Sequence, residues 1–244
     1  MFTQCIKQTS IWAVGAIMVA STAVMADEKV SVRGMLDSLI PEAKDFKIVY
    51  KLDPSNSKTT NGGREMVYTS DKKSEIIGDI DKIAYALILN GKDYIFVSMD
   101  PFTTDLGKIG VPDVSSKINF QQKVKNMFVK SNVKGVKNGN FPEDGNIEFW
   151  SNNYGPVNAS KVPGASSSKY DFGDQKSGGP LGYGSMQVHN SKAKQTIFAF
   201  NDFKSGKNAD LGIGNNPKGH LDWTFANNAG KYQSAKLYIM IKTK

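Results

Sequence analysis

The chain has 244 residues, of which 31 are Lys or Arg and 23 are Asp or Glu, so its formal net charge is +8 at neutral pH. A chain of this length can bury a sizeable hydrophobic core. Arg33 and Arg64 are the only arginines and the lysines are scattered, whereas nucleic-acid readers concentrate positive charge on one face and use Arg for base contacts. The composition therefore argues against a nucleic-acid partner, while attraction to acidic cell-surface polymers stays open.

The N-terminal residues follow the order of an export signal. Lys7 supplies a positive start, residues 11–20 form an apolar stretch, and Val24-Met25-Ala26 fits the rule of small residues before a cleavage point. The apolar stretch is shorter than the about 20 residues that a transmembrane helix needs. We therefore expect a signal peptide over 1–26, no transmembrane segment after its removal, and a periplasmic or extracellular protein. An uncleaved N-terminal anchor is the alternative.

The mature chain contains no cysteine, because Cys5 lies inside the predicted signal. Disulfides, Cys nucleophiles and Cys–His metal sites are therefore excluded from the exported protein. Removal of the signal takes away only the charge of Lys7, so the net charge changes from +8 to +7.

After the signal, residues 30–44 are predicted to form one short helix, which Pro41 interrupts. The rest of the chain reads as β-structure, since β-branched and aromatic residues alternate with polar ones or form short apolar runs. The expected strands are 46–52, 66–68, 80–89, 94–99, 124–133, 147–150, 185–189, 196–201 and 235–241. Asn90-Gly91 stands between two of these runs and is a strong hairpin signal.

The segments 100–120 and 151–182 are long and rich in Ser, Pro, Gly and Asn, which is typical of functional or disordered loops. We find no internal repeat and no linker. The sequence therefore predicts a lead-in segment over 27–45 and a single domain over 46–244. The expected fold is all-β, a jelly-roll-like antiparallel sandwich with long loops and at most one or two short helices.

The sequence carries no clear catalytic signature. It has no G-x-S-x-G nucleophile elbow. His189 ends a predicted strand, and His220 precedes Asp222, which is an arrangement that suits a base and its orienting carboxylate. Loop carboxylate pairs are plentiful, but a glycosidase needs a particular separation between its two carboxylates that a sequence does not reveal. We therefore name no catalytic residue.

The strongest local pattern is aromatic. Trp150, Tyr154 and Trp223 lie in or beside Gly- and Asn-rich segments. An aromatic ring offers a flat apolar face on which a sugar ring can stack, while neighbouring polar groups bond its hydroxyls. The candidate polar contacts are Asn201, Asp202, Asn215, His220 and Asp222. The alternative is that these rings belong to the core.

The segment from Tyr170 to Asp174 is the densest in carboxylates. Asp-rich loops suit Ca²⁺, which takes six to eight oxygen ligands. We therefore name Asp171 and Asp174 as candidate ligands of a structural calcium ion, although no EF-hand spacing is present.

Five runs in the C-terminal half belong together: Gly145–Trp150, Tyr170–Asp174, Tyr183–Asn190, Leu211–Asn215 and Asp222–Ala226. In combination they resemble a largely uncharacterised domain of secreted bacterial proteins. That domain often accompanies sialate O-acetylesterase-like and other sugar-active modules. The resemblance implies a sugar-related accessory domain, and it assigns no residue a role.

The function that we expect is non-catalytic binding of a glycan or polysaccharide. The first alternative is a carbohydrate-active esterase or glycosidase that uses His220 or a loop carboxylate pair. The second is a structural protein of the cell envelope that binds other proteins through exposed sheet edges. Neither the sugar nor the oligomeric state follows from the sequence.

Export predicts cleavage after Ala26, because the small residues of the signal end there. Mass spectrometry of the native protein should find Asp27 as its first residue. Recovery of the intact N terminus on cytoplasmic protein would reject the export prediction.

Overall fold

The computed structural model describes residues 33–55, 68–112, 119–150, 183–193, 195–203, 210–214 and 232–244. The chain divides into two compact units, Met1–Lys44 and Asp45–Lys244. All of the predicted signal 1–26 lies outside the described residues.

The described part of the first unit is helical. Residues 33–39 form an α-helix, and the 3-10 turn η1 (Pro41–Ala43) follows it. The helix stops before Pro41 because proline has no N–H to donate. Arg33 links the start of the helix to the 3-10 turn. Its Nε donates to Asp37 Oδ2 at 2.9 Å, and its Nη2 donates to the carbonyl of Ala43 at 2.9 Å. The predicted short helix is thus confirmed over 33–39.

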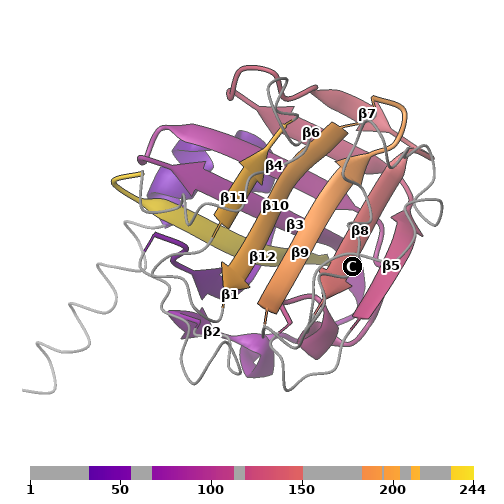
Figure 1. The fold of residues 1–244 in the computed structure, drawn as a ribbon. Helices are drawn as coiled ribbons and strands as arrows, with labels where there is room; N and C mark the ends of the chain where they lie inside the picture. Colours follow the sequence, from indigo (N-terminus) through magenta and orange to yellow (C-terminus); the bar gives the residue numbers. More distant parts are fainter. Residues whose placement is uncertain are drawn as a thin grey trace, which may run out of the picture. The chain divides into compact units, whose positions relative to one another are not determined.

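The second unit consists of two antiparallel sheets (Figure 1). The strands are β1 (Lys47–Leu52), β2 (Ser70–Asp71), β3 (Ile80–Leu89), β4 (Asp93–Met99), β5 (Asn119–Val124), β6 (Met127–Ser131), β7 (Gly139–Phe141), β8 (Gly145–Trp150), β9 (Tyr183–Asn190), β10 (Gln195–Phe203), β11 (Asp210–Ile213) and β12 (Ala235–Thr243). One sheet has the order β2-β1-β12-β3-β4-β6-β7, and the other has the order β11-β10-β9-β8-β5. Two 3-10 turns, η2 (Lys73–Glu75) and η3 (Leu106–Lys108), lie in the connections.

The two sheets share one hydrophobic core, so the predicted all-β, jelly-roll-like antiparallel sandwich is confirmed. The ring of Tyr85 on β3 lies 6.5 Å from that of Phe198 on β10, which joins the sheets by an aromatic contact. Ile147 and Phe149 on β8 and Met186 and Val188 on β9 point into the same core and have no exposed surface. The chain passes between the sheets after β4, β5, β7 and β11.

The Asn90-Gly91 hairpin forms as predicted. Asn90 has a φ of 52° and Gly91 a φ of 68°, which are the left-handed values of a primed turn, and the N–H of Lys92 donates to the carbonyl of Leu89 at 3.2 Å. The turn sets the register of β3 against β4, in which Leu89 pairs with Asp93.

The prediction of one strand over 124–133 is wrong. Strand β5 ends at Val124 and β6 begins at Met127, and the two belong to different sheets. Asn126 makes the break with a φ of 49°, and its N–H donates to the carbonyl of Pro142 at 2.9 Å. Asn tolerates this left-handed conformation better than most residues do. The uninterrupted apolar pattern concealed the turn.

The short edge strands were also missed. β7 and β11 have three and four residues, and β2 covers Ser70–Asp71 where the sequence predicted 66–68. Strands this short carry too few residues for a period-two pattern to emerge. Residues 66 and 67 lie outside the described part of the chain.

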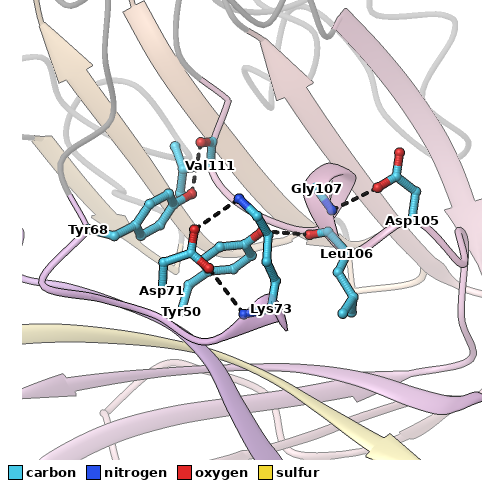
Figure 2. A network of polar contacts seen from close by, with 8 residues as sticks. All are labelled: Tyr50, Tyr68, Asp71, Lys73, Asp105, Leu106, Gly107 and Val111. Atoms are coloured by element: carbon cyan, nitrogen blue, oxygen red, sulfur yellow. Dashed lines mark hydrogen bonds and ion pairs between the residues drawn. The ribbon is translucent and has the colours of Figure 1, made fainter. Parts of the chain in front are cut away.

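Three tyrosine hydroxyls hold the connection that follows β4. Tyr50 donates to the carbonyl of Leu106 at 2.9 Å and Tyr68 to that of Val111 at 3.0 Å, as Figure 2 shows. Tyr85 donates to the carbonyl of Ile109 at 2.8 Å. Residues 106–111 of the predicted loop 100–120 are therefore held in place by three side-chain hydrogen bonds.

The rings of Tyr50 and Tyr68 stack with their centroids 4.6 Å apart, and Lys73 Nζ lies 6.0 Å from the centroid of Tyr50 (Figure 2). Burial, together with the charges of Asp71 and Asp105, raises the pKa of Tyr50 to about 12. The hydroxyl of Tyr50 therefore stays protonated and remains a donor at neutral pH. Since the polar groups of this network bond one another, we interpret it as structural.

No helix in the described parts of the chain combines the length and apolar character that crossing a bilayer requires.

Replacing Tyr85 with Phe should destabilise the sandwich, because it leaves the carbonyl of Ile109 without its buried donor. The expected loss in the free energy of unfolding is about 1–3 kcal/mol, measured by urea denaturation. Tyr94→Phe is the matched control, since the Tyr94 side chain is only partly buried and makes no hydrogen bond within the described residues. Equal losses in the two variants would contradict the anchoring role of Tyr85.

Candidate functional site

The candidate site lies on the outer face of the five-stranded sheet. Side chains alternate between the two faces of a strand. Because Ile147 and Phe149 of β8 face the core, Asn146 and Glu148 face outward. On β9, the core residues Met186 and Val188 likewise place Gln187 and His189 on the outer face.

Strand register assembles these residues into two rows. Asn146 pairs with His189, which pairs with Thr196 of β10. Glu148 pairs with Gln187, which pairs with Ala199, and Gly212 of β11 follows Ala199. We call Asn146, Glu148, Gln187, His189 and Thr196 the polar cluster. All five are buried, and none exposes more than 1% of its surface.

A chain of contacts runs through the middle of the polar cluster. His189 Nε2 lies 3.2 Å from Glu148 Oε1, and His189 Nδ1 lies 3.1 Å from Thr196 Oγ1. The imidazole is therefore held between a carboxylate and a hydroxyl. A buried carboxylate is tolerated when a partner of this kind compensates its lost hydration.

The amides of the polar cluster are not satisfied. Among the described residues, neither Oε1 nor Nε2 of Gln187 has a hydrogen-bond partner. Asn146 Nδ2 bonds Ser191 Oγ, but Asn146 Oδ1 has no described partner. Each unpaired buried polar group costs about 1–3 kcal/mol. Such groups in a native fold call for an explanation, and a polar ligand is one.

The polar residues on either side of the β9–β10 turn have a different role. Asn190 and Gln195 pair with each other and occupy the core side of the sheet. Asn190 Oδ1 accepts from the N–H of Ala193 at 3.0 Å, which closes the β9–β10 turn. Gln195 Nε2 donates to the carbonyl of Gly135 at 2.7 Å and so links the two sheets. We leave these residues out of the candidate site.

The strand register brings two of the predicted ligand residues together. Trp150 pairs with Ser185, and Ser185 pairs with Asn201, so both predicted residues stand in the row that follows Glu148–Gln187 along the strands. Asp202 pairs with Gly184 and so holds the next position, on the opposite face. The side chains of these residues are not described.

The other predicted residues lie outside the described residues. These are Tyr154, Asn215, His220, Asp222 and Trp223, together with the predicted calcium ligands Asp171 and Asp174. Among the residues that the structure does describe, no group of three or more His, Cys, Asp or Glu side chains is placed to hold a metal ion. The calcium site stays a prediction.

Sequence reasoning treated His189 as a strand end and overlooked Glu148 and Gln187. The available signal was the alternation of polar and apolar residues in β8 and β9. An ordinary solvated face gives the same alternation, however, so the pattern could not indicate that the polar residues are buried.

In comparisons with known proteins, no family model, no curated protein and no solved structure matches the chain. The resemblance to the secreted sugar-associated domain therefore stays a prediction.

Removing one member of the Glu148–His189 pair should be costly, because the other would stay buried and lose this contact. His189→Leu is expected to lower the free energy of unfolding by about 3–5 kcal/mol, and the double variant Glu148→Met, His189→Leu should recover much of that loss. Chemical denaturation measures both. The control is Lys123→Met, which removes the exposed ion pair between Lys123 of β5 and Glu143 and should change little. Additive losses in the double variant would show that the two side chains do not compensate each other.

Proposed function

We propose that this protein is exported and binds a carbohydrate, without catalysing a reaction, on the outer face of the five-stranded sheet. The observation that carries the proposal is the carboxamide of Gln187, which is fully buried within the polar cluster and has no hydrogen-bond partner at either end in the part of the chain that the structure describes. The sheet supports it rigidly, because the backbone around Gln187 pairs with β8 on one side and β10 on the other.

Sugar hydroxyls match the chemistry of this cluster. Each hydroxyl is both a donor and an acceptor, so it can bond either end of a carboxamide. Binding would also remove the desolvation cost that Gln187 and Asn146 carry in the free protein. A polar site on a rigid sheet, in which few groups fix the orientation of the ligand, is typical of ligand-binding proteins.

The position of Trp150 adds support. It lies two residues beyond Glu148 on β8, which is about 7 Å along the strand. A ligand of one or two sugar rings spans that separation. An aromatic residue beside polar groups suits a sugar, which has an apolar face and a polar rim.

Burial of the polar cluster has a kinetic consequence. Since Gln187 has no exposed surface, a ligand reaches it only after the protein opens. Association that requires a conformational change is slower than the usual 10⁵–10⁷ M⁻¹s⁻¹, the approximate range for protein encounters. We expect slow association and slow release.

A second function, catalysis, draws on one observation. Glu148, His189 and Thr196 follow the order carboxylate, imidazole and hydroxyl, with separations of 3.2 and 3.1 Å. Covalent catalysis uses this order for its orienter, base and nucleophile. We favour binding because the Gln187 amide and Asn146 Oδ1, which have no hydrogen-bond partner within the described residues, have no part in this catalytic order.

The proposal predicts opposite effects of one substitution on stability and on binding. Gln187→Met keeps the shape of the side chain but removes an unsatisfied amide, so the melting temperature should stay the same or rise. Binding to a glycan array should weaken by about tenfold or more, since two hydrogen bonds are lost.

Gln122→Met is the matched control, because Gln122 lies on β5 of the same sheet and is exposed. Gln122→Met should change neither the melting temperature nor the binding to the glycan array. Failure of the wild-type protein to bind any glycan would reject the proposed function. Release of acetate or reducing sugar would favour catalysis instead.

A further inference from the structure

We infer that four exposed lysines in three linked connections form a second binding surface, and that its ligand is a polysaccharide rich in carboxylate groups. We call Lys92, Lys134, Lys137 and Lys192 the lysine surface. It includes no residue of the polar cluster, so the inference goes beyond the proposed function and does not depend on it.

The four lysines lie between strands of the second unit. Lys92 belongs to the β3–β4 turn, Lys134 and Lys137 to the β6–β7 connection, and Lys192 to the β9–β10 turn. All four are exposed. They are scattered in the sequence, so only the fold can bring the three connections together.

Asn132 links the first two connections. Its Oδ1 accepts from the N–H of Tyr94 at 2.7 Å, and its Nδ2 donates to the carbonyl of Lys92 at 2.9 Å. The hydroxyl of Ser131 adds a hydrogen bond to the carbonyl of Tyr94 at 2.7 Å. The backbone of Lys92 is therefore bonded to a residue that lies two positions before Lys134.

Gln195 links the second connection to the third. Its Oε1 accepts from the N–H of Lys137 at 3.0 Å, and its Nε2 donates to the carbonyl of Gly135 at 2.7 Å. Asn190 Oδ1 closes the turn that carries Lys192 by accepting from the N–H of Ala193. The backbone of the lysine surface is thus ordered before a ligand binds, which lowers the entropic cost of binding.

The lysine surface carries an excess of positive charge. Among the described residues, none of its four ammonium groups forms an ion pair. Two acidic residues adjoin the same connections: Asp93 follows Lys92, and the carbonyl of Asp144 accepts from the N–H of Ser191 at 2.7 Å. Both are partly buried, whereas the four lysines are exposed. Positive charge therefore outnumbers negative charge where these connections meet solvent.

Several exposed lysines elsewhere on the second unit differ in this respect, because an acidic side chain neutralises them. Lys73 Nζ lies 2.9 Å from Asp71 Oδ2 at η2, and Lys108 Nζ lies 3.6 Å from Asp105 Oδ2 at η3. An anion that approached these lysines would have to compete with a carboxylate already in place. The lysine surface asks for no such exchange.

The weakness of each exposed charge contact favours a polymer as the ligand. An exposed ion pair contributes at most about 1 kcal/mol, so a single carboxylate would be held poorly. A chain of acidic sugars engages several lysines at once, and each contact after the first is intramolecular. The ammonium group is a compact charge with rotatable donors, which tolerates carboxylates at varied spacing along a flexible chain.

The residue types around the lysines argue against other polyanions. Residues 90–92, 132–138 and 191–193 contain neither arginine nor an aromatic residue. Nucleic-acid recognition uses Arg for base edges and aromatic rings for stacking. Helices that lie on membrane surfaces combine Lys with large apolar side chains. An acidic polysaccharide that is held by charge requires none of these.

The experiment measures binding of the full mature chain to a polyuronate, to the same polymer with its carboxylates methyl-esterified, to duplex DNA and to vesicles of anionic phospholipid. The wild type should bind the polyuronate most tightly at low salt. The esterified polymer should bind about tenfold more weakly or worse, because it has lost its charge. NaCl at about 0.5 M should remove most of the binding, since salt screens exposed charges.

Replacing all four residues of the lysine surface with Gln should weaken polyuronate binding about tenfold or more, since four charge contacts are lost. The matched control removes four exposed lysines from elsewhere on the second unit and should weaken binding only slightly; its substitutions are Lys47→Gln, Lys73→Gln, Lys108→Gln and Lys244→Gln. Replacing the lysine surface with Arg should preserve binding. Thermal unfolding checks that every variant folds.

Equal weakening by the two sets of Gln substitutions would overturn the inference, because binding would then follow net charge alone. Tighter binding to DNA or to vesicles, undiminished binding of the esterified polymer, or no binding of the polyuronate would overturn it as well. So would loss of polyuronate binding in Gln187→Met, which would assign the acidic polymer to the polar cluster. Failure of the proposed function is a separate result, namely no binding of any neutral glycan.

Discussion

The seven-stranded sheet depends on β12, the last strand of the chain. It lies between β1 and β3 and pairs with both, so segments separated by most of the sequence become neighbours (Figure 1). Its residues Leu237, Ile239 and Ile241 point into the core and are fully buried. Because these contacts are so distant in sequence, their formation carries a large loop-closure cost, which hydrophobic burial offsets. Without β12, β1 and β2 would have no sheet to join.

The shared core also determines where the polar cluster lies. The apolar residues of β8 and β9 pack into the core. Because side chains alternate between the two faces of a strand, Glu148, Gln187 and His189 lie on the outer face. Burial of a carboxylate, an imidazole and an amide costs stability, and only part of that cost is compensated by the contacts within the cluster. Functional sites commonly carry such local costs, which the rest of the fold offsets.

Long apolar runs were predictable because their pattern depends only on neighbours in the sequence. Strand β3 was predicted with its observed bounds, and the Asn90-Gly91 turn was predicted from two residues. The break at Asn126 was not, since the apolar pattern continues across it while the chain changes sheet. The hydrogen bonds from three tyrosine hydroxyls to residues 106–111 could not be predicted either, because the carbonyls that accept them are distant in sequence.

The sequence alone determined the all-β class and most of the strands, because alternation and short apolar runs are local properties of the chain. Trp150 and Asn201 could be named as candidates, but their place in one row required the register of β8, β9 and β10. Only the tertiary structure decided that Glu148 lies beside His189 and that the buried amide of Gln187 has no hydrogen-bond partner within the described residues. Burial and hydrogen bonding depend on which strands become neighbours, and the pairing of strands is set by the whole core.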